Sequence, residues 1–436
     1  MSRKHIYDKD TGYDILKPII DYHLFHSYRK VEVHGKENIP SDGAVIIAPN
    51  HTNTLMDALV ILRADKNPTV FGARADIFRH PLIARIMYFL RILPMVRQRD
   101  GLRNVLKNHE TTETIVEIIE HDVPFCLYPE GTHRTKHSLR VLGKGVSRAA
   151  FTAVERMQGK KPVYIVPVGL EYGDYFRFRS TSLLTFGRPI NVTEFLTAHA
   201  DENEAHLMDT LRKELKTRMS ELITYINDDE NYEAVWTLTK MLAVAEPGTK
   251  YGECGSSLYK SMLRNKEIVE KITVLQEAEP EKMQAIFKDV LEFEKERKRK
   301  KISIYSFGRK NPGMRSIGKA AAALIGLPYF LFSAVFALPM WGAAEAIRSI
   351  VKDPAFRNTV SFGIHLVLGP IWYIAVASIA FCTAPWWIAS ILTILTLPAY
   401  NYFYDYLEGA RRWISDLRLL RSGSIKKKFK KIVESI

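Results

Sequence analysis

The sequence predicts an α/β protein with a layered, mostly parallel sheet, followed by a helical segment and C-terminal transmembrane helices. Short apolar runs alternate with stretches of helical apolar spacing up to about residue 192, and two long blocks without formal charge lie near the C-terminus. Of the 436 residues, 47% are hydrophobic, so the chain has enough apolar side chains for packed cores and is not disordered.

Six short runs bounded by turn-forming residues are predicted as strands. They are KVEVHG (30–35), AVIIAP (44–49), PTVFGA (68–73), PFCLYPEG (124–131), VYIVPVGLEY (163–172) and LLTFGRPI (183–190). Helical spacing is seen in LIARIMYFL (82–90), RNVLKNHETTETIVEIIEH (103–121) and VSRAAFTAVERM (146–157). Strands that alternate with helices are typical of a largely parallel sheet, so we predict one α/β domain over residues 30–192.

The rest of the chain divides by composition. Residues 1–29 form an amphipathic N-terminal segment, and the stretch GYDILKPIIDYHLFHSYRK (12–30) is expected either to lie at a membrane interface or to pack on the domain. Residues 193–318 form a charged helical region, and its basic end, EFEKERKRKK, is either a solvated helix or a membrane-surface segment. Residues 319–404 are apolar, and residues 405–436 form a basic tail.

The apolar region predicts membrane-spanning or re-entrant helices. The 25 residues of 320–344 and the 47 residues of 358–404 carry no formal charge, and about 20 apolar residues cross a bilayer core. Buried helices of a soluble domain are the alternative. The basic residues before 320, within 345–358 and after 405 all favour the cytoplasmic side, so we expect a hairpin over 359–404 with a turn near CTAPWW. The stretch 320–344, interrupted by Pro328 and Pro339, is then expected to enter the bilayer and return.

The charge balance limits the partners. A formal net charge of +14 favours anionic partners, namely nucleic acid, anionic lipid or phosphorylated substrates. No nucleic-acid-binding motif accompanies the charge, so a lipid bilayer is the expected partner. The tail segment 411–431 carries nine basic residues and one acidic residue, with apolar anchors expected at Trp413, Leu417, Leu419, Leu420 and Phe429.

The location follows from the cysteines and the N-terminus. The three cysteines are far apart and lack disulfide or metal spacing, and the N-terminal residues lack the apolar run of a secretory signal. We therefore expect a membrane protein with its catalytic domain on the cytoplasmic face.

The stretch APNHTNTLMDALV (48–60) suggests a catalytic pair. His51 ends an apolar run that is a predicted strand, and Asp57 lies in the first turn of the helix expected after it. The junction of a strand and a helix is the usual ligand site of open α/β sheets. A carboxylate there can reach back to the imidazole, fix its tautomer and stabilise its protonated form. A lone histidine near an aspartate is also common on protein surfaces.

A second stretch, LYPEGTHRTKHSLRVLGKG (127–145), also leaves a predicted strand and is rich in glycine and cations. Gly131 allows close backbone approach, Thr132 offers a hydroxyl, and Arg134 can bind phosphate through its guanidinium group. Glu130 repels phosphate, so we expect it to hold one of the cations or a substrate hydroxyl. An ordinary strand-to-helix loop is the alternative.

Together the two stretches resemble the glycerolipid acyltransferases, which esterify glycerol phosphate or lysophosphatidate. Four blocks correspond in order over roughly residues 30–192: NHTNTLMD, beginning at Asn50; LPMVRQRDG, with Arg97 and Arg99; YPEGTHR; and IVPVGLEY, with Pro167 and Gly169. The resemblance covers less than half of the chain. Each block is weakly specific alone, but the ordered set is highly specific.

Two departures from the family pattern stand out. Most members separate the histidine and the aspartate by four residues, whereas five intervene here, and His133 separates EGT from Arg134. If the turn before the helix absorbs the extra residue, Asp57 still reaches His51; otherwise Asp57 is the wrong partner. The longer spacing and the apolar C-terminal half resemble the fungal glycerol-3-phosphate and dihydroxyacetone-phosphate acyltransferases more than the small bacterial lysophosphatidate enzymes.

The resemblance implies a role for each matching residue. His51 is the expected general base, oriented by Asp57, and acts on an alcohol that would otherwise attack a thioester poorly. The acceptor and its phosphate are expected at Arg97, Glu130, Gly131, Thr132 and Arg134, with Asn50, Arg99, Lys144 and Pro167 as further candidates. Backbone N–H groups near Gly131 or in the helix after His51 are expected to stabilise the oxyanion.

The expected acyl donor is acyl-CoA or acyl carrier protein, whose thiol leaves readily, so no cofactor is needed. No metal is expected, because the histidines show no ligand spacing. Two other functions remain open. A lysophosphatidate acyltransferase would make phosphatidate, and a basic membrane scaffold would have no catalytic activity.

Overall fold

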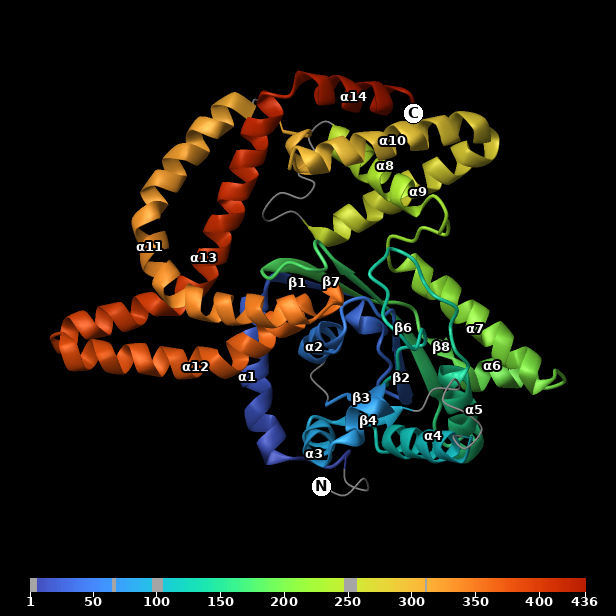
Figure 1. Cartoon of the computed structure of the whole chain (residues 1–436). Helices are drawn as coiled ribbons and strands as arrows, with labels where there is room; N and C mark the ends of the chain where they lie inside the picture. The colour runs from blue at the N-terminus through green and yellow to red at the C-terminus, as the bar shows by residue number, and fades with distance from the viewer. Residues whose placement is uncertain (1–5, 65–67, 96–104, 247–256, 310–311) are drawn as a thin grey trace. The chain divides into compact units, whose positions relative to one another are not determined.

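The computed structural model describes residues 6–64, 68–95, 105–246, 257–309 and 312–436. The chain divides into two compact units. Unit 1 comprises Met1–Phe25, Lys30–Tyr175 and Thr181–Ile223, and unit 2 comprises His26–Arg29, Phe176–Ser180 and Thr224–Ile436. Figure 1 shows the elements of both units along the chain.

The described residues form an eight-stranded mixed sheet in unit 1. Its strands are β1 (Tyr28–His34), β2 (Ala44–Pro49), β3 (Val70–Arg74), β4 (Ile92–Met95), β5 (Phe125–Cys126), β6 (Val163–Tyr172), β7 (Ser180–Phe186) and β8 (Ile190–Asn191). The order is β1-β7-β6-β2-β5-β3-β4, and β8 pairs with β6. The pairs among β2 to β6 are parallel, whereas β7 and β8 pair antiparallel with β6. The predicted α/β fold with a mostly parallel sheet is confirmed.

The central strand β2 places its carboxyl end between two neighbours. Ile47 pairs with Cys126 of β5 and with Val166 of β6, and all six residues of β2 are buried. A strand buried on both faces reads as a continuous apolar run rather than an alternating one, which is why AVIIAP was recognisable in the sequence. The loops that follow β2 and β5 therefore leave the sheet at the same edge.

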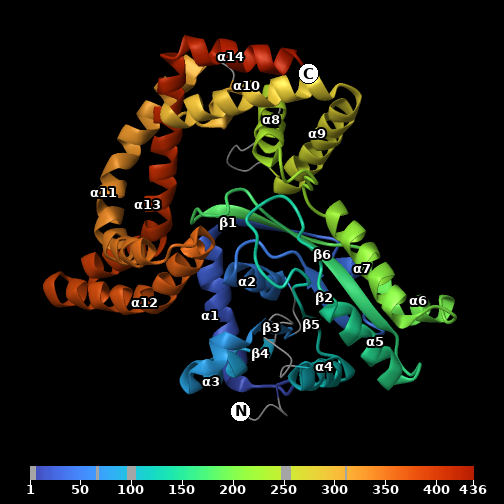
Figure 2. The same cartoon turned by 45° about the vertical axis from the view of Figure 1, so that its right-hand side comes forward.

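Seven helices belong mainly to unit 1: α1 (Thr11–Ser27), α2 (Leu55–Ala64), α3 (Pro81–Phe89), α4 (Val105–Glu120), α5 (Gly145–Met157), α6 (Val192–Ala198) and α7 (Glu204–Glu221). Helices α4 and α5 pack on the central strands, and α6 and α7 pack on β6 (Figure 2). In α7 the leucines at every fourth position, Leu207, Leu211 and Leu215, are buried. The first helices of the expected charged region thus belong to unit 1.

All six predicted strands are present, with two differences of detail. The run 183–190 is divided into β7 and β8. Strand β4, with the sequence ILPM, was not predicted, because a four-residue strand beside a helix has too few residues to show a period.

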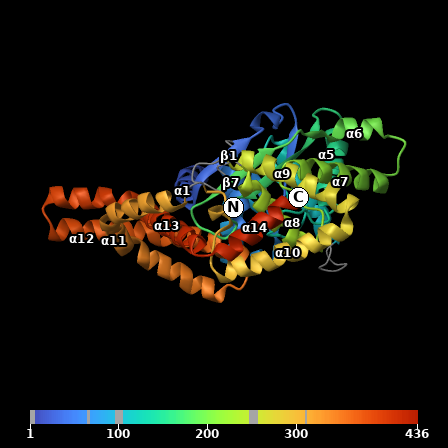
Figure 3. The same cartoon turned by 90° about the horizontal axis from the view of Figure 1, so that it is seen from above.

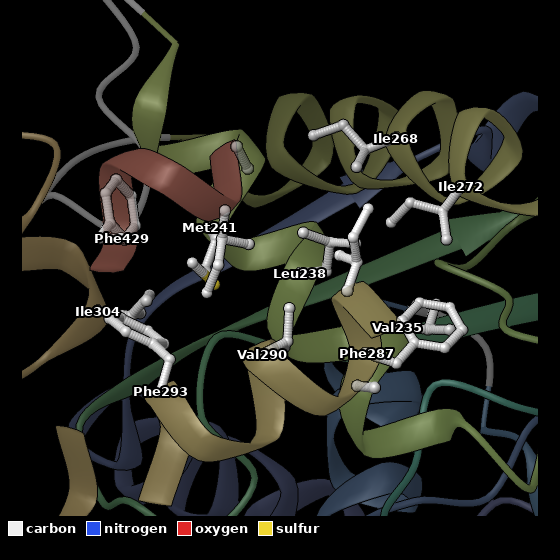
Figure 4. Packing of buried hydrophobic residues seen from close by; sticks show 14 of the residues in the cluster. Val235, Leu238, Met241, Ile268, Ile272, Phe287, Val290, Phe293, Ile304 and Phe429 are labelled. Carbon is white, nitrogen blue, oxygen red and sulfur yellow. The ribbon is translucent and has the colours of Figure 1, made fainter. Parts of the chain in front are cut away.

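A helical core forms one part of unit 2. It consists of α8 (Tyr232–Ala245), α9 (Leu258–Ala278), α10 (Pro280–Arg299) and α14 (Gly423–Glu434). Figure 4 shows Leu238, Val290 and Phe429 among the buried side chains of this core. In α14 the apolar residues Ile425, Phe429 and Ile432 are buried in this core. The expectation that Leu419 and Phe429 anchor the tail in a membrane is therefore wrong, since both lie inside the protein.

Three long helices complete unit 2: α11 (Pro312–Ile350), α12 (Arg357–Thr383) and α13 (Trp386–Leu420). Two candidate spans, Ser316–Ile350 and Pro354–Thr383, are long and apolar enough to cross a membrane by length and composition. The predicted turn within CTAPWW separates α12 from α13 (Figure 3).

Helix α11 differs from the expected re-entrant stretch. It continues through Pro328 and Pro339 without reversing direction, and Figure 1 shows it bent. A proline inside a helix removes one hydrogen bond and kinks the axis, but packing against neighbouring helices can hold the kinked helix together. In this chain α11 packs along α13.

A buried ionic cluster joins the beginning of α11 to the end of α13. Asp416 is fully buried and accepts hydrogen bonds from Lys319 Nζ at 2.6 Å and from Ser306 Oγ at 2.7 Å, and it pairs with Arg309. Burial raises the pKa of Asp416, but these donors outweigh burial and hold its pKa below the ordinary value. Residue 319 and residue 416 therefore lie at the same end of the helical bundle.

Candidate active site

His51 and Asp57 converge where β2 ends and α2 begins. The two are joined by a hydrogen bond of 2.8 Å between His51 Nδ1 and Asp57 Oδ2. The turn between them absorbs the extra residue, because Thr54 adopts a left-handed backbone conformation with φ of 48°. Helix α2 then starts at Leu55, and Asp57 falls in its first turn. The inserted residue thus leaves the aspartate within reach of the imidazole.

The Asp57 carboxylate is fully buried and held by several donors. Oδ2 accepts the backbone N–H groups of Thr52 and Asn53 at 2.8 and 2.7 Å, in addition to the imidazole. Oδ1 accepts the Tyr172 hydroxyl at 2.6 Å and the Thr52 hydroxyl at 3.4 Å. A buried carboxylate is tolerated only when its charge is hydrogen-bonded in this way.

Asp57 holds the Nδ1 atom of His51, and the His51 side chain is 19% exposed. Its ring stacks on Tyr128 with centroids 4.2 Å apart, and the ring of His133 meets it edge-on at 5.9 Å. Burial, together with Cys126 and Asp57, raises the pKa of Tyr128 well above its ordinary value, so the phenol stays neutral. With Nδ1 engaged by Asp57, Nε2 is the nitrogen that can take a proton from a substrate.

Glu130 ties the two motifs together. Its Oε1 accepts the backbone N–H of His51 and its Oε2 accepts the backbone N–H of Arg140, both at 2.9 Å. Burial raises the pKa of Glu130, and the hydrogen bonds from the two amides offset only part of that rise. The expectation that Glu130 holds a cation or a substrate hydroxyl is corrected: its carboxylate instead links two backbone segments.

The loop after β5 lies beside the histidine. The backbone N–H of Arg134 donates to the His51 carbonyl at 2.8 Å. Gly131 is exposed with φ of 66°, where a side chain would be strained, and nothing lies within 4 Å of where a Cβ would be. Thr132 and Arg134 are partly buried. The loop that carries the predicted phosphate-binding residues therefore lies next to His51.

The other predicted site residues make contacts elsewhere in the domain or lie outside the described residues. Asn50 exchanges two hydrogen bonds with the backbone of Leu170, so it links β2 to β6. Pro167 is buried in β6 opposite Ala48. Lys144 lies 3.8 Å from Asp209 of α7 and is paired there rather than beside His51. Arg97 and Arg99 lie outside the described residues.

The expected oxyanion donors are already engaged. The amides of Thr52 and Asn53 point at Asp57, and the amide of Gly131 donates to the Tyr128 carbonyl at 3.1 Å. In this structure these three N–H groups therefore hold the Asp57 carboxylate and the turn at Gly131 in place.

Four residues of the site were not predicted from the sequence. Besides Tyr172, a buried pair joins His137 Nδ1 to Glu171 Oε1 at 3.5 Å, with the hydroxyl of Tyr175 at 3.4 Å from His137 Nε2. His137 belongs to the loop after β5. Glu171 and Tyr172 are the last two residues of β6, and Tyr175 lies three residues beyond its end. The only sequence signal was the polar ending of an otherwise apolar strand, VYIVPVGLEY.

No group of three or more His, Cys, Asp or Glu side chains within the described residues is placed to hold a metal ion.

Comparisons with known proteins address the same region. Residues 30–171 match the family model described as Acyltransferase. Among solved structures, the chain is similar to the crystal structure of the 1-acyl-sn-glycerophosphate (LPA) acyltransferase PlsC from Thermotoga maritima, at 19% sequence identity and a TM-score of 0.34, over 48% of this chain and 82% of that chain. Curated protein sequences give no match. The family-model match covers His51, Asp57, Glu130 and Tyr128.

Proposed function

Because residues 30–171 form an acyltransferase domain, this chain is an acyltransferase, and we propose that it transfers a fatty acyl group from an acyl thioester to glycerol 3-phosphate or dihydroxyacetone phosphate. The proposed donors are the acyl thioesters of coenzyme A and of acyl carrier protein. The observation that carries the proposal is the contact of His51 with Asp57 beside the cationic loop after β5. Lysophosphatidate is the alternative acceptor.

The geometry supports direct attack by the acceptor hydroxyl. His51 Nε2 removes the hydroxyl proton as the oxygen bonds to the thioester carbonyl carbon, and Asp57 stabilises the resulting imidazolium. When the tetrahedral intermediate collapses, the C–S bond breaks and the imidazolium returns the proton to the departing thiolate. The reaction needs no covalent acyl-enzyme.

The acceptor phosphate is assigned to Thr132 and Arg134, because their loop contacts the backbone of His51. A guanidinium group binds phosphate through two parallel hydrogen bonds. The two arginines of the second block, Arg97 and Arg99, complete the proposed set from sequence alone. No further cofactor is proposed.

An exposed apolar face of unit 1 suits a bilayer. On α1 the residues Ile15, Ile19, Tyr22 and Phe25 recur at helical spacing and are between 45% and 65% exposed. The opposite face of α1, with Tyr13 and Leu24, is buried, so the two expectations for this segment, packing on the domain and facing lipid, apply to different faces. We propose that the acyl chain enters from the bilayer beside this face.

The contact of Lys319 with Asp416 supports a membrane arrangement that we propose. Because both residues lie at one end of the bundle, the proposed arrangement has the chain between them cross the bilayer an even number of times. We propose that α12 and the apolar start of α13 form the crossing hairpin, with the catalytic domain and the basic tail on the cytoplasmic face.

Cys382, exposed near the α12–α13 turn, tests this arrangement. In a variant lacking Cys254, a membrane-impermeant maleimide should label Cys382 only from the side opposite the C-terminus. Labelling from the same side as the C-terminus would mean that α11 and α12 are the crossing pair instead.

The function is tested with purified full-length protein in mixed micelles. Each acceptor is supplied with radiolabelled acyl-CoA and, separately, with radiolabelled acyl-ACP, the thioester of acyl carrier protein, for the wild type, His51→Ala and the control His206→Ala, whose side chain is 69% exposed. General-base catalysis contributes about 10²- to 10⁴-fold, so His51→Ala should lose at least that factor and His206→Ala should lose none.

The outcome also separates the acceptors. Turnover of glycerol 3-phosphate or dihydroxyacetone phosphate supports the proposal, and turnover of lysophosphatidate alone supports the alternative. If no acceptor is turned over, or if His51→Ala retains full activity, the proposed function is wrong.

A further inference from the structure

Tyr172 is the last residue of β6 and is 4% exposed. Its hydroxyl donates to Asp57 Oδ1 at 2.6 Å, a length typical of an O–H group bonded to an ionised carboxylate. Tyr172 is 115 residues from Asp57 in the sequence.

The donors to Asp57 differ in origin. The imidazole of His51 and the amides of Thr52 and Asn53 come from the same turn as the aspartate, and they all bind Oδ2. Oδ1 is bound by the Tyr172 hydroxyl at 2.6 Å and more distantly by the Thr52 hydroxyl at 3.4 Å. Tyr172 is thus the short contact that fixes the second oxygen, and it comes from a different element.

The support of Tyr172 is rigid. Its backbone pairs with Ser182 of β7 within the sheet, and its ring lies 5.8 Å from that of Tyr175. A donor mounted on a paired strand holds its partner more accurately than a donor on a loop.

We propose that Tyr172 is a positioning residue of the acyl-transfer site, whose phenol fixes the rotation of the Asp57 carboxylate so that Oδ2 faces His51. The kinetic part of this inference rests on the proposed function. The effect of Tyr172 on the state of His51 does not, and it can be measured without any acyl substrate.

The direction of the effect follows from the charge of Asp57. When the phenol is removed, the carboxylate keeps more of its negative charge for His51, and the protonated imidazole is favoured. The other groups around His51 are Tyr128 and His133 beside its ring and Glu130 at its backbone amide. Changing residue 172 alters none of these contacts.

The first test is Tyr172→Phe, which removes only the hydroxyl oxygen. The matched control is Tyr164→Phe on the same strand, whose exposed hydroxyl contacts Asp42 at 3.4 Å. Tyr172→Phe should lower kcat roughly ten-fold, as expected for loss of a hydrogen bond to a charged group, and leave KM within about two-fold. The acidic limb of its pH–rate profile should move to higher pH, and Tyr164→Phe should match the wild type.

The second test follows carbethoxylation of His51 by diethyl pyrocarbonate in the intact protein, read by mass spectrometry of the peptide that carries it. The pH midpoint of this modification should rise in Tyr172→Phe. A fluorotyrosine at position 172, which is a stronger donor of the same shape, should lower the midpoint. In the Asp57→Asn background, Tyr172→Phe should cause no further loss of kcat.

The outcomes are distinguishable. An unmoved midpoint together with a kcat within two-fold of the wild type would overturn the role of Tyr172. A wild-type protein that acylates no acceptor would overturn the proposed function, while the modification of His51 would still report on Tyr172.

Discussion

Asp57 and Asp416 are two fully buried aspartates with different hydrogen-bonding partners, and we propose a catalytic role for the first and a structural role for the second. Asp416 binds the guanidinium group of Arg309 and the ammonium group of Lys319. Asp57 binds backbone amides, hydroxyl groups and the imidazole of His51. Both carboxylates are densely hydrogen-bonded, so neither burial nor the number of donors distinguishes a catalytic carboxylate from a structural one.

The proposed distinction lies in the chemistry of the partner. A carboxylate paired with arginine and lysine contributes to the stability of the fold, whereas a carboxylate paired with a histidine that acts as a general base can stabilise the imidazolium that forms during a reaction. The two aspartates can therefore be compared by the same substitution, Asp→Asn, which preserves shape and removes charge.

The largest effect is expected for Asp57→Asn. An asparagine can hold His51 in the wrong tautomer and cannot stabilise the imidazolium, so kcat/KM for acyl transfer should fall about 10³- to 10⁴-fold. The measurement is initial rate with saturating acyl donor, and exposed Asp289→Asn is the control. If Asp57→Asn keeps a tenth or more of the wild-type activity, the proposed difference in role between Asp57 and Asp416 is wrong.

Asp416→Asn should affect stability instead. It leaves buried Arg309 without its carboxylate, which costs about 3–5 kcal/mol of unfolding free energy, and kcat of the folded protein should stay within about three-fold of the wild type. Thermal unfolding in detergent measures the change in unfolding free energy, with Asp289→Asn as the control. If kcat falls as far as it does for Asp57→Asn in a folded sample, Asp416 is not merely structural.

The pH dependence of this contribution has a defined sign. Because the pKa of Asp416 is lowered in the folded protein, its stabilising contribution is present above the ordinary carboxylate pKa and is lost as the pH falls through the lowered one. Wild type should lose stability in that acidic range relative to Asp416→Asn.

Glu130→Gln tests a third buried carboxylate, which accepts hydrogen bonds from two backbone amides. A glutamine offers one acceptor oxygen where Glu130 uses two, so one of the amides of His51 and Arg140 loses its partner, at a cost of about 1–3 kcal/mol. The pKa of Glu130 is raised in the folded state, so its contribution is full at low pH and is lost as the pH rises through the raised value. The stability difference between wild type and Glu130→Gln should therefore widen as the pH is lowered from 7 to about 4.5.

Urea unfolding at both pH values measures that difference, and exposed Glu155→Gln is the control. A difference that is constant with pH would show that Glu130 has the same charge state in both forms of the chain.

The smallest effect is expected for Thr52→Val. The substitution removes the hydroxyl at 3.4 Å from Asp57 and keeps the backbone N–H at 2.8 Å, so kcat should change by about two-fold or less. A larger loss, measured beside Tyr172→Phe, would show that the longer contact to Oδ1 matters as much as the shorter one.

The sequence predicted those parts of the molecule that depend on local spacing. The strands appear as apolar runs, and His51 and Asp57 belong to one strand–turn–helix passage, so their contact required only a turn between them. The role of Glu130 was predicted incorrectly, because its partners are backbone amides, which no side-chain pattern reveals.

Contacts between distant segments were missed for the same reason. Tyr172 meets Asp57 only because β2 and β6 are neighbours in the sheet, and Phe429 looked like a membrane anchor because the sequence does not show the helical core that buries it. The spacing of apolar residues predicts which face of a helix or strand is buried, but it does not predict which other helix or strand covers that face.

The left-handed residue Thr54 has a consequence for comparing such enzymes. Since the turn takes up the additional residue before α2 begins, the first-turn carboxylate of Asp57 reaches the imidazole although five residues intervene. A fixed gap between histidine and aspartate is therefore too narrow a search criterion. Removing one residue from the turn should leave the dyad intact, whereas removing one from within the helix would rotate the carboxylate by about 100° away from the imidazole.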